Sequence, residues 1–260
     1  MSGVMARTLA ILELLAGQVG GTPLAYIADE LDIPRGACHR LLTDLKAHGY
    51  VRQLREHGDY VLTTKLVGLG LSFLSTSGIV DMAQTTLDRL AEASGELVRM
   101  ALVDGDRITW VAKAQGAVKG LKYDPDMGMD TRLSCTATGH AWMMTMTDER
   151  AVELVSRQGF GQPEDFGPAA PTTINGLLAF LHAARERGYA TIVEVFAPGM
   201  TAMAAPIRRK GYPATGVISI AGPRIRLDEK RMAALGPALL AAAAELAAAS
   251  HASPLFERFK

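Results

Sequence analysis

The sequence predicts an α+β protein, within the broad α/β class, made of a winged helix-turn-helix domain, a linker helix and a second domain with a mainly antiparallel sheet. Its 260 residues, 48% hydrophobic and 21% charged, suffice for two cores and a polar surface. The first 63 residues have the pattern of three helices followed by a hairpin, whereas the rest mixes helices with hairpins instead of βαβ repeats. The expected boundaries are residues 1–63, 64–94 and 95–260.

Three helices are expected in the first domain, over residues 5–18, 24–31 and 34–48. Thr22 is the expected N-cap of the second helix, with Pro23 at its first helical position. Pro34 starts the third helix, which ends at Gly49. Its apolar residues recur at i, i+3, i+4 and i+7, so one face is expected in the core: Cys38, Leu41, Leu42 and Leu45.

A wing should follow the third helix. Two short β-prone runs, residues 50–54 and 60–63, flank a polar turn that contains Gly58. Helix is then expected over residues 65–93, with a break at Gly78, and the periodicity changes from Glu96. The second domain should contain strands over residues 97–103, 107–114, 200–207 and 214–221, and helices over residues 138–146, 148–158, 174–188 and from the cap Asp228 to about 250.

The charge of the whole chain gives it no attraction for nucleic acid, because 27 lysines and arginines balance 27 aspartates and glutamates. Residues 34–65 depart from this balance, with six basic against three acidic residues. A local positive patch on a helix and a hairpin favours contact with phosphates. Any binding to nucleic acid is therefore expected at this segment.

The chain shows no sign of export or of a membrane span. Two cysteines, Cys38 and Cys135, are too few for a disulfide framework and are typical of a reducing cytoplasm. Glu13 interrupts the apolar run near the start, which excludes a secretion signal. Residues 238–249 are interrupted by Glu245 and are shorter than the ~20 residues of a membrane helix. We expect a cytoplasmic protein.

Catalysis and metal binding have little support. Cys135 and His140 could form a nucleophile and base, but their spacing matches no catalytic pattern and no third group orients them. A buried hydrophobe is the alternative role for Cys135. The six histidines are scattered without ligand spacing, so no metal or other cofactor is expected.

The order of several strings resembles the IclR family of bacterial transcription regulators over essentially the whole chain. In the first domain the strings are residues 9–13, 27–28, 41–42 and 49–51 with Tyr60; in the second they are residues 94–96, 136–139, 187–190, 204–207 and 219–223. The resemblance implies a GAF-like effector domain, a homodimer or homotetramer, and binding to double-stranded operator DNA under the control of a small molecule. It implies no enzyme activity.

Residues 34–48 are then expected to form a DNA recognition helix; on pattern alone they could equally be an amphipathic helix of a protein-binding module. Arg35 and His39 are our candidates for base contacts, and Thr43 lies on the same free face. The candidates for phosphate contacts are Arg40 on the helix and Arg52 and Arg55 on the wing. The family usually has Ser-Thr where this chain has Gly36 and Ala37, and Gly36 would let the helix approach DNA closely.

The candidate effector site is the string Thr136-Ala137-Thr138-Gly139 at the start of a helix, where N–H groups favour an anion. An ordinary N-cap is the alternative. The resemblance adds further residues around this pocket: Tyr123, Glu194, Ala202, Ser219 and Ala221. Acidic residues of the family are replaced here by Ile192 and Val195, so we expect a small organic acid with an apolar or aromatic body. The methionines of this domain could line the pocket or fill the core.

A ligand-binding or enzymatic GAF-like domain, whose winged module serves protein association, is the alternative function. It would show no salt-dependent affinity for DNA.

Overall fold

A computed structural model of the chain describes residues 3–55, 58–77, 79–123 and 131–249. The chain divides into two compact units, residues 1–76 and 77–260. Each unit has a hydrophobic core of its own.

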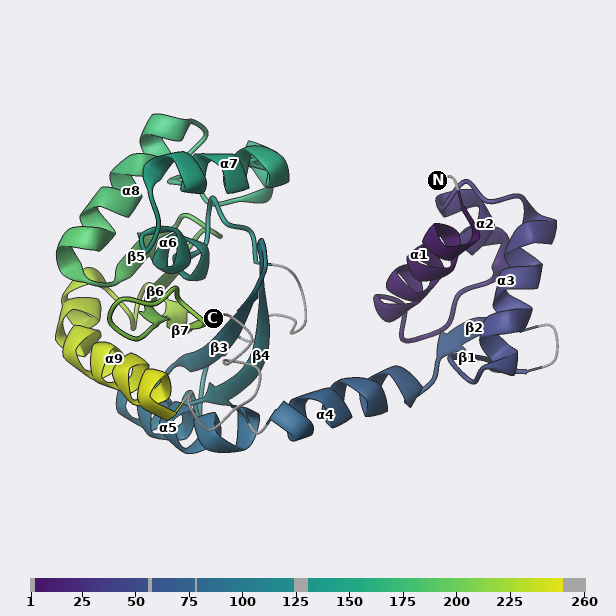
Figure 1. Ribbon diagram of the computed structural model, residues 1–260, viewed down its shortest axis with the longest axis horizontal. Coiled ribbons are helices and arrows are strands. Elements are labelled where there is room, and N and C mark those ends of the chain that lie inside the picture. Colours follow the sequence, from purple (N-terminus) through teal and green to yellow (C-terminus); the bar gives the residue numbers. More distant parts are fainter. Residues whose placement is uncertain (1–2, 56–57, 78, 124–130, 250–260) are drawn as a thin grey trace. The chain divides into compact units, whose positions relative to one another are not determined.

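The first unit is a three-helix domain with a two-stranded wing (Figure 1). Its elements are α1 (Val4–Ala16), α2 (Leu24–Glu30), α3 (Arg35–Ala47), β1 (Val51–Gln53) and β2 (Tyr60–Leu62). The two strands pair antiparallel. All five elements contribute to the core, with Ile11, Ile27, Leu42, Val51 and Tyr60 among its residues. The predicted winged helix-turn-helix is confirmed.

Thr22 does not cap α2, contrary to the prediction. Its N–H and C=O pair with the backbone of Tyr60 at 3.0 and 2.9 Å, which adds a short bridge to the wing. This pairing holds Thr22 in the wing and buries its side chain. Pro23 takes the N-cap position instead, in an extended conformation, and makes no side-chain cap. Proline suits this place because it has no N–H that needs a partner.

The turn between α2 and α3 depends on one residue in the left-handed region. Asp32 has φ +50°, a conformation that aspartate tolerates better than most residues. The N–H of Ile33 then donates to the carbonyl of Ala28 at 2.9 Å, and the Ile33 side chain is buried. The turn thus fixes the direction of α3, whose predicted apolar face is buried in full: Cys38, Leu41, Leu42 and Leu45.

The helical stretch after the wing consists of α4 (Lys65–Ser77) and α5 (Ile79–Ser94). The expected break falls between them, and Gly78 itself lies outside the described residues. The two units also divide here, between Thr76 and Ser77. The buried residues of α5 include Leu87 and Leu90. This half of the stretch expected as a linker is therefore a core helix of the second unit.

The second unit is built on a five-stranded sheet in the order β4-β3-β7-β6-β5, and all neighbouring strands are antiparallel. The strands are β3 (Leu97–Asp104), β4 (Arg107–Gln115), β5 (Ala190–Val193), β6 (Met200–Ile207) and β7 (Gly216–Pro223). The predicted antiparallel sheet is confirmed. Strand β5 was not predicted, because four residues are too few to show a clear alternation.

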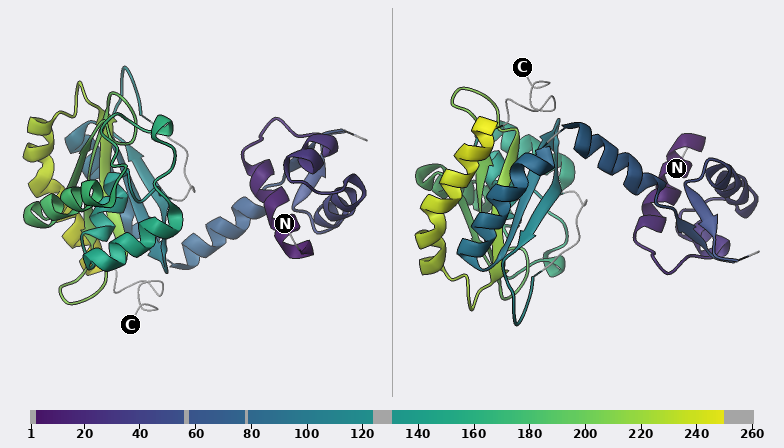
Figure 2. Two further views of the ribbon diagram at one scale, coloured as in Figure 1. Left: turned by 90° about the horizontal axis from the view of Figure 1, so that it is seen from above. Right: turned by 90° about the horizontal axis from the view of Figure 1, so that it is seen from below.

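Helices cover both faces of this sheet (Figure 1, Figure 2). On one face, α5 and α9 (Glu229–Ala249) pack together and against the strands. On the other face lie α6 (Ala137–Met143) and α8 (Ile174–Arg187), and α7 (Asp148–Gln158) adds to the same core. The sheet therefore separates two cores, and the effector candidates belong to the face that carries α6.

Among the described helices, α9 is long and apolar enough to cross a membrane by length and composition alone, with 21 residues instead of the shorter stretch considered above. Its apolar side chains, such as Leu235 and Leu239, are buried in the core between the sheet and α5. Asp228 caps it as predicted, accepting the N–H of Arg231 at 2.7 Å. In this structure α9 is a core helix.

Candidate functional site

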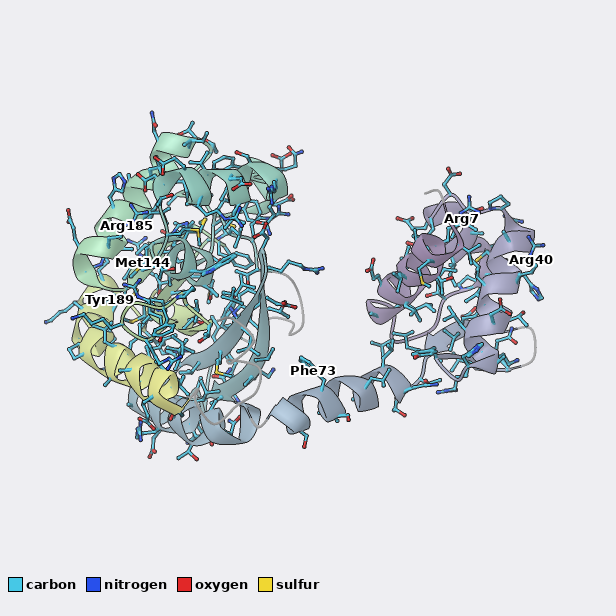
Figure 3. The ribbon with its side chains drawn as sticks, in the orientation of Figure 1. Arg7, Arg40, Phe73, Met144, Arg185 and Tyr189 are labelled. Atoms are coloured by element: carbon cyan, nitrogen blue, oxygen red, sulfur yellow. The ribbon has the colours of Figure 1, made fainter. Side chains whose placement is uncertain are left out.

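One candidate site is the exposed face of α3, which carries five of the predicted DNA contacts: Arg35, Gly36, His39, Arg40 and Thr43. Arg40 projects away from the helix (Figure 3). Because the opposite face is buried in the core, this surface is the one that α3 can offer to a partner. An α-helix with a free face fits the major groove of DNA, which is ~12 Å wide.

The contacts of these side chains leave the face open. Arg35 approaches Asp29 at 3.4 Å, but both side chains are exposed, and such a pair contributes little and exchanges readily. The Thr43 hydroxyl donates to the carbonyl of His39 at 2.8 Å, so only its oxygen remains as an acceptor. A Cβ on Gly36 would meet nothing within 4 Å, so the fold of this unit does not require glycine there.

The wing places further cations beside α3. Arg52 on β1 and Arg55, two residues after this strand, are both exposed. The turn closes through the N–H of Gly58 and the carbonyl of Arg55 at 2.8 Å, while residues 56 and 57 lie outside the described residues. Lys46 joins α3 to the wing through a 3.1 Å hydrogen bond with Gln53. The wing thus adds exposed basic residues to those of α3.

The second candidate site is a cavity of about 340 Å³ in the second unit. Seven of the nine predicted effector residues line it: Tyr123, Thr136, Ala137, Thr138, Ala202, Ser219 and Ala221. They come from the start of α6, from β6 and β7, and from the segment after β4. These stretches are far apart in the sequence, and the fold brings them together at one end of the α6 face.

The buried charge of the cavity comes from Arg99 on β3, which is 6% exposed. Its guanidinium carbon lies 3.8 Å from the ring centroid of Trp110, which also lines the cavity. A β-bulge makes this possible: Met100 pairs with Ala112 but Ala101 pairs with Trp110, so one residue of β4 is left over. The extra residue reverses the alternation of side chains and turns Trp110 to the face of Arg99.

Apolar and aromatic groups make up much of the remaining lining: Phe166, Ile192, Phe196 and Met200. Phe166 and Phe196 stand on two loops, with ring centroids 6.4 Å apart. The loops touch through the N–H of Gly167 and the carbonyl of Val195 at 3.0 Å. A side chain at Gly167 would collide with the carbonyl of Glu194, only 2.0 Å from its Cβ. The positions of Phe166 and Phe196 in the cavity lining therefore depend on this close approach of the two loops.

Two predicted effector residues do not line the cavity. Gly139 packs against the backbone of Leu133, whose carbonyl oxygen would lie 2.5 Å from a Cβ at this position. Glu194, with φ +53°, pairs with Arg224 and accepts the N–H of Gly199 at 2.9 Å. The hydrogen bond from Gly199 is the main reason why the pKa of Glu194 is lowered. Both residues shape the backbone around the cavity.

The N-cap alternative for the Thr136 string is realised in part. The Thr136 side chain accepts the N–H of Gly139 at 3.0 Å and donates to the carbonyl of Arg132 at 2.7 Å. Ala137 and Thr138 are the first two residues of α6, so their N–H groups have no acceptor within the helix. The N–H of Gly139 is already bonded to the Thr136 side chain. The fixed positive charges of the cavity lining are those of Arg99 and Arg132.

Sequence reasoning did not find Arg99, Trp110, Arg132, Asp165, Phe166, Phe196 or Thr201. Arg99 had a usable signal, since a charged residue inside the apolar run of residues 97–103 needs a reason. Trp110 had none, because its direction depends on the bulge. Of the described methionines discussed above, Met200 lines the cavity, while Met143 and Met203 fill the core. Met127 and Met129 lie outside the described residues.

Cys135 and His140 do not form a nucleophile and base. Burial raises the pKa of the Cys135 thiol to about 12, so the thiol is protonated at neutral pH. Burial lowers the pKa of His140 to about 4, and its Nε2 bonds the carbonyl of Ser134 at 2.7 Å. Both side chains serve the core, as the alternative role for Cys135 predicted. Within the described parts of the chain, no group of three His, Cys, Asp or Glu residues could hold a metal ion.

Comparison with known proteins identifies the family. Residues 4–55 match the IclR helix-turn-helix domain, and residues 71–248 match the C-terminal domain of the bacterial transcriptional regulator IclR. The chain belongs to the IclR family. The predicted family is thereby confirmed, and this IclR-family protein is a DNA-binding transcription regulator and not an enzyme.

Individual relatives of the IclR-family chain cover most of its length. It is 27% identical to the transcriptional repressor IclR of Escherichia coli over 93% of this chain and 88% of the relative. It is 30% identical to the regulator BhcR of Paracoccus denitrificans over 92% and 84%. An IclR regulator from Alicyclobacillus acidocaldarius has the same fold, with a TM-score of 0.81 and 21% identity over 96% and 99%. An IclR homologue from Microbacterium hydrocarbonoxydans, solved with 4-hydroxybenzoate, has a TM-score of 0.74 and 18% identity over 96% and 100%.

Proposed function

We propose that this regulator binds operator DNA through α3 and the wing, and that a small organic acid in the cavity of the second unit controls this binding. It would act in the cytoplasm of a bacterium. Arg35 and His39 read bases, Gly36 and Thr43 lie against the groove, and Arg40, Arg52 and Arg55 hold phosphates. The excess of basic over acidic residues in residues 34–65, within a chain of zero net charge, supports binding of DNA by this segment.

The observation that carries the ligand class is the buried guanidinium of Arg99 in a cavity lined largely by aromatic and aliphatic groups. A buried cation favours an anionic ligand, because charge-assisted hydrogen bonds are strong where water is excluded. The apolar side chains of Ile192, Ala202 and Ala221 cannot satisfy hydroxyl groups. An aromatic or branched aliphatic carboxylate meets both demands, and a cavity of about 340 Å³ has room for a single ring.

A relative supports this class. The Microbacterium hydrocarbonoxydans homologue was solved with 4-hydroxybenzoate, which combines a carboxylate with one aromatic ring. We infer the same general chemistry for this chain and take benzoate as the simplest probe. The effector favours one arrangement of the two winged domains in an oligomer, and DNA selects the arrangement that matches its half-sites.

A homodimer or homotetramer follows from the same proposal. A single wing and helix offer few phosphate contacts, and two linked copies gain affinity by binding twice. Val67, Leu69, Leu71 and Phe73 leave α4 with more exposed apolar surface than a solvated helix needs. We expect this surface to pack against a second copy.

A thermal-shift screen tests the ligand class. Benzoate, 4-hydroxybenzoate and phenylacetate are each compared with their uncharged amides on the full chain. A ligand of the folded state raises the melting temperature by mass action. We expect at least one carboxylate to stabilise the protein and its amide to do so much less. If acids and amides raised the melting temperature equally, the charge of Arg99 would have no role in binding.

A further inference from the structure

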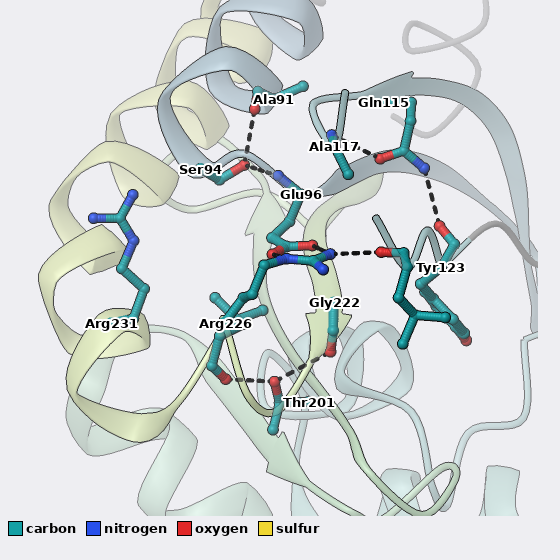
Figure 4. A network of polar contacts seen from close by, with 12 residues as sticks. Ala91, Ser94, Glu96, Gln115, Ala117, Tyr123, Thr201, Gly222, Arg226 and Arg231 are labelled. Atoms are coloured by element: carbon teal, nitrogen blue, oxygen red, sulfur yellow. Dashed lines mark hydrogen bonds and ion pairs between the residues drawn. The ribbon is translucent and has the colours of Figure 1, made fainter. Parts of the chain in front are cut away.

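Glu96 and Arg226 form an ion pair close to the cavity. Both carboxylate oxygens of Glu96 accept hydrogen bonds from one guanidinium, at 2.6 Å from Nε and 2.8 Å from Nη2 (Figure 4). The Glu96 side chain is 4% exposed and that of Arg226 is 35% exposed. The hydrogen bond with Glu96 is the main reason why the pKa of Arg226 is raised. A bidentate pair of this kind fixes orientation as well as charge.

On one side this pair is attached to the last turn of α5. The N–H of Glu96 donates to Ser94 Oγ at 3.3 Å, and that hydroxyl donates to the carbonyl of Ala91 at 3.3 Å. Gly116 lies so close that a Cβ there would be 1.9 Å from the carbonyl oxygen of Ala91. The N–H of Gly116 donates to the carbonyl of Glu96 at 3.0 Å. The backbone of Glu96 is therefore connected to the end of α5.

On the other side the pair is attached to the cavity. Arg226 Nη2 donates to the carbonyl of Leu121 at 2.9 Å, two residues before Tyr123, which lines the cavity (Figure 4). Gln115 donates to the carbonyl of Tyr123 at 3.0 Å. We call residues 117–123 the Tyr123 wall. Arg226 and Gln115 are thus its polar anchors among the hydrogen bonds of the described residues.

The backbone of β7 leaves room for this arrangement. A Cβ on Gly222 would lie 2.5 Å from Glu96 Oε2, so the carboxylate lies directly against the strand. The hydroxyl of Thr201, which lines the cavity, donates to the carbonyl of Leu227 at 2.5 Å and lies 3.4 Å from the carbonyl of Gly222. The carboxylate is therefore close to two parts of the cavity lining.

We propose that the Glu96–Arg226 pair couples the Tyr123 wall to the last turn of α5, so that filling the cavity changes the stability of that turn. The proposal rests on the proposed function for the identity of the cavity as the effector site. It makes Arg226 a positioning residue, which acts on the ligand through the wall. This turn is at the end of α5, and the start of the same helix, at Ile79, follows two residues after the end of α4.

The chain provides a matched control on the same helix. Arg89 of α5 pairs with Glu245 of α9, and both side chains are about half exposed or more. That pair joins α5 to α9 but has no hydrogen bond to the Tyr123 wall among the described residues. Arg89→Met thus removes an ion pair of α5 without touching the proposed connection.

Hydrogen exchange of the full chain without any ligand is the first experiment. Arg226→Met is compared with the double variant Glu96→Gln/Arg226→Met, which leaves no buried carboxylate without its cation. In both variants we expect amides of residues 117–123 and of residues 91–96 to exchange faster together, by about tenfold, while Arg89→Met leaves residues 117–123 unchanged. A double variant in which the wall loosens but residues 91–96 keep the wild-type rate would overturn the coupling.

The second experiment adds benzoate as the probe and uses the melting temperature to show whether it binds. In the wild type, saturating benzoate should change exchange at residues 91–96, and in the double variant it should bind without this change. Binding without any change at residues 91–96 in the wild type would also overturn the proposal. If benzoate does not bind, the ligand class of the proposed function fails for this probe, and the first experiment still decides the role of the pair.

Discussion

The guanidinium of Arg99 lies over the ring of Trp110, with 3.8 Å between the guanidinium carbon and the ring centroid. Arg99 is on β3 and Trp110 is on β4. The β-bulge in the pairing of these two strands puts both side chains on the α6 face of the sheet. The contact holds a cation in place at the wall of an otherwise largely apolar cavity. The ligand class that we propose depends on this pair.

Replacing Arg99 should separate acids from neutral ligands. Arg99→Met keeps a long apolar side chain over Trp110 but removes the charge. A hydrogen bond to a charged group contributes about 1.5 to 3 kcal/mol, so benzoate should bind roughly 10 to 100 times more weakly. Isothermal titration with benzoate and benzamide checks this, and benzamide affinity should stay within about twofold of the wild type. An equal loss for both ligands would mean that the variant has damaged the cavity.

The two roles assigned on α3 and the wing predict different DNA defects. Arg40→Ala should weaken binding to all duplexes similarly and reduce the salt dependence, because a phosphate contact carries no sequence information. Arg35→Ala should relax preference at one base position by about 1 to 3 kcal/mol. Titration at two salt concentrations measures both effects, with a duplex selected by the protein from a random pool and a scrambled one. Identical losses for both variants would contradict the division, and no salt-dependent affinity at all would favour the protein-association alternative.

The exposed side chains of α4 predict an oligomer. We expect the full chain at micromolar concentration to sediment as a dimer or larger species, and Leu69→Asp/Phe73→Asp to shift it towards the 27.7 kDa monomer. Figure 3 shows the Phe73 side chain projecting from α4. Val19→Asp, which changes a 92% exposed apolar side chain in a turn, is the control. A wild-type monomer under these conditions would refute the prediction.

His140 should make stability depend on pH. Burial lowers its pKa from 6.5 to about 4, so between these values the unfolded chain binds a proton that the folded chain does not. The free energy of unfolding therefore falls as the pH is lowered from 6.5 to 4, by up to about 3 kcal/mol from this residue. Urea unfolding of the wild type and of His140→Gln at pH 7, 5.5 and 4.5 measures the difference. Parallel curves for the two proteins would show that His140 is not responsible.

Local patterns were enough for much of the fold. The spacing of Cys38, Leu41, Leu42 and Leu45 predicted which face of α3 is buried. The antiparallel sheet contains the four strands that were predicted and one further strand, β5, that was not. Thr22 was misjudged because its backbone pairs with Tyr60, which is distant in sequence, and such pairing outweighs a local capping preference. A local signal cannot reveal a bridge of this kind.

The cavity likewise contains residues that local patterns predicted and residues that depend on contacts between distant segments. The Thr136 string was found from its place at the start of a helix and Ser219 from the family resemblance, and the structure brings them to one cavity. Arg99 stands opposite Ser219 in the β3–β7 register, a pairing that needs the strand order of the whole sheet. The direction of the Trp110 side chain depends on the β-bulge as well. The positions of Phe166 and Phe196 depend on the close approach of Gly167 to Glu194. These are properties of assembled strands and loops, so the residues alone did not predict them.

The most direct test of the account is the affinity for DNA with and without the carboxylate that stabilises the wild type most. The selected duplex is titrated at one salt concentration with the wild type and with Arg99→Met. We predict that the carboxylate changes the wild-type dissociation constant by about tenfold, that its amide does not, and that Arg99→Met responds only at much higher concentration. A wild type that binds the carboxylate yet keeps the same affinity for DNA, or an Arg99→Met variant that responds at the wild-type concentration, would contradict the account.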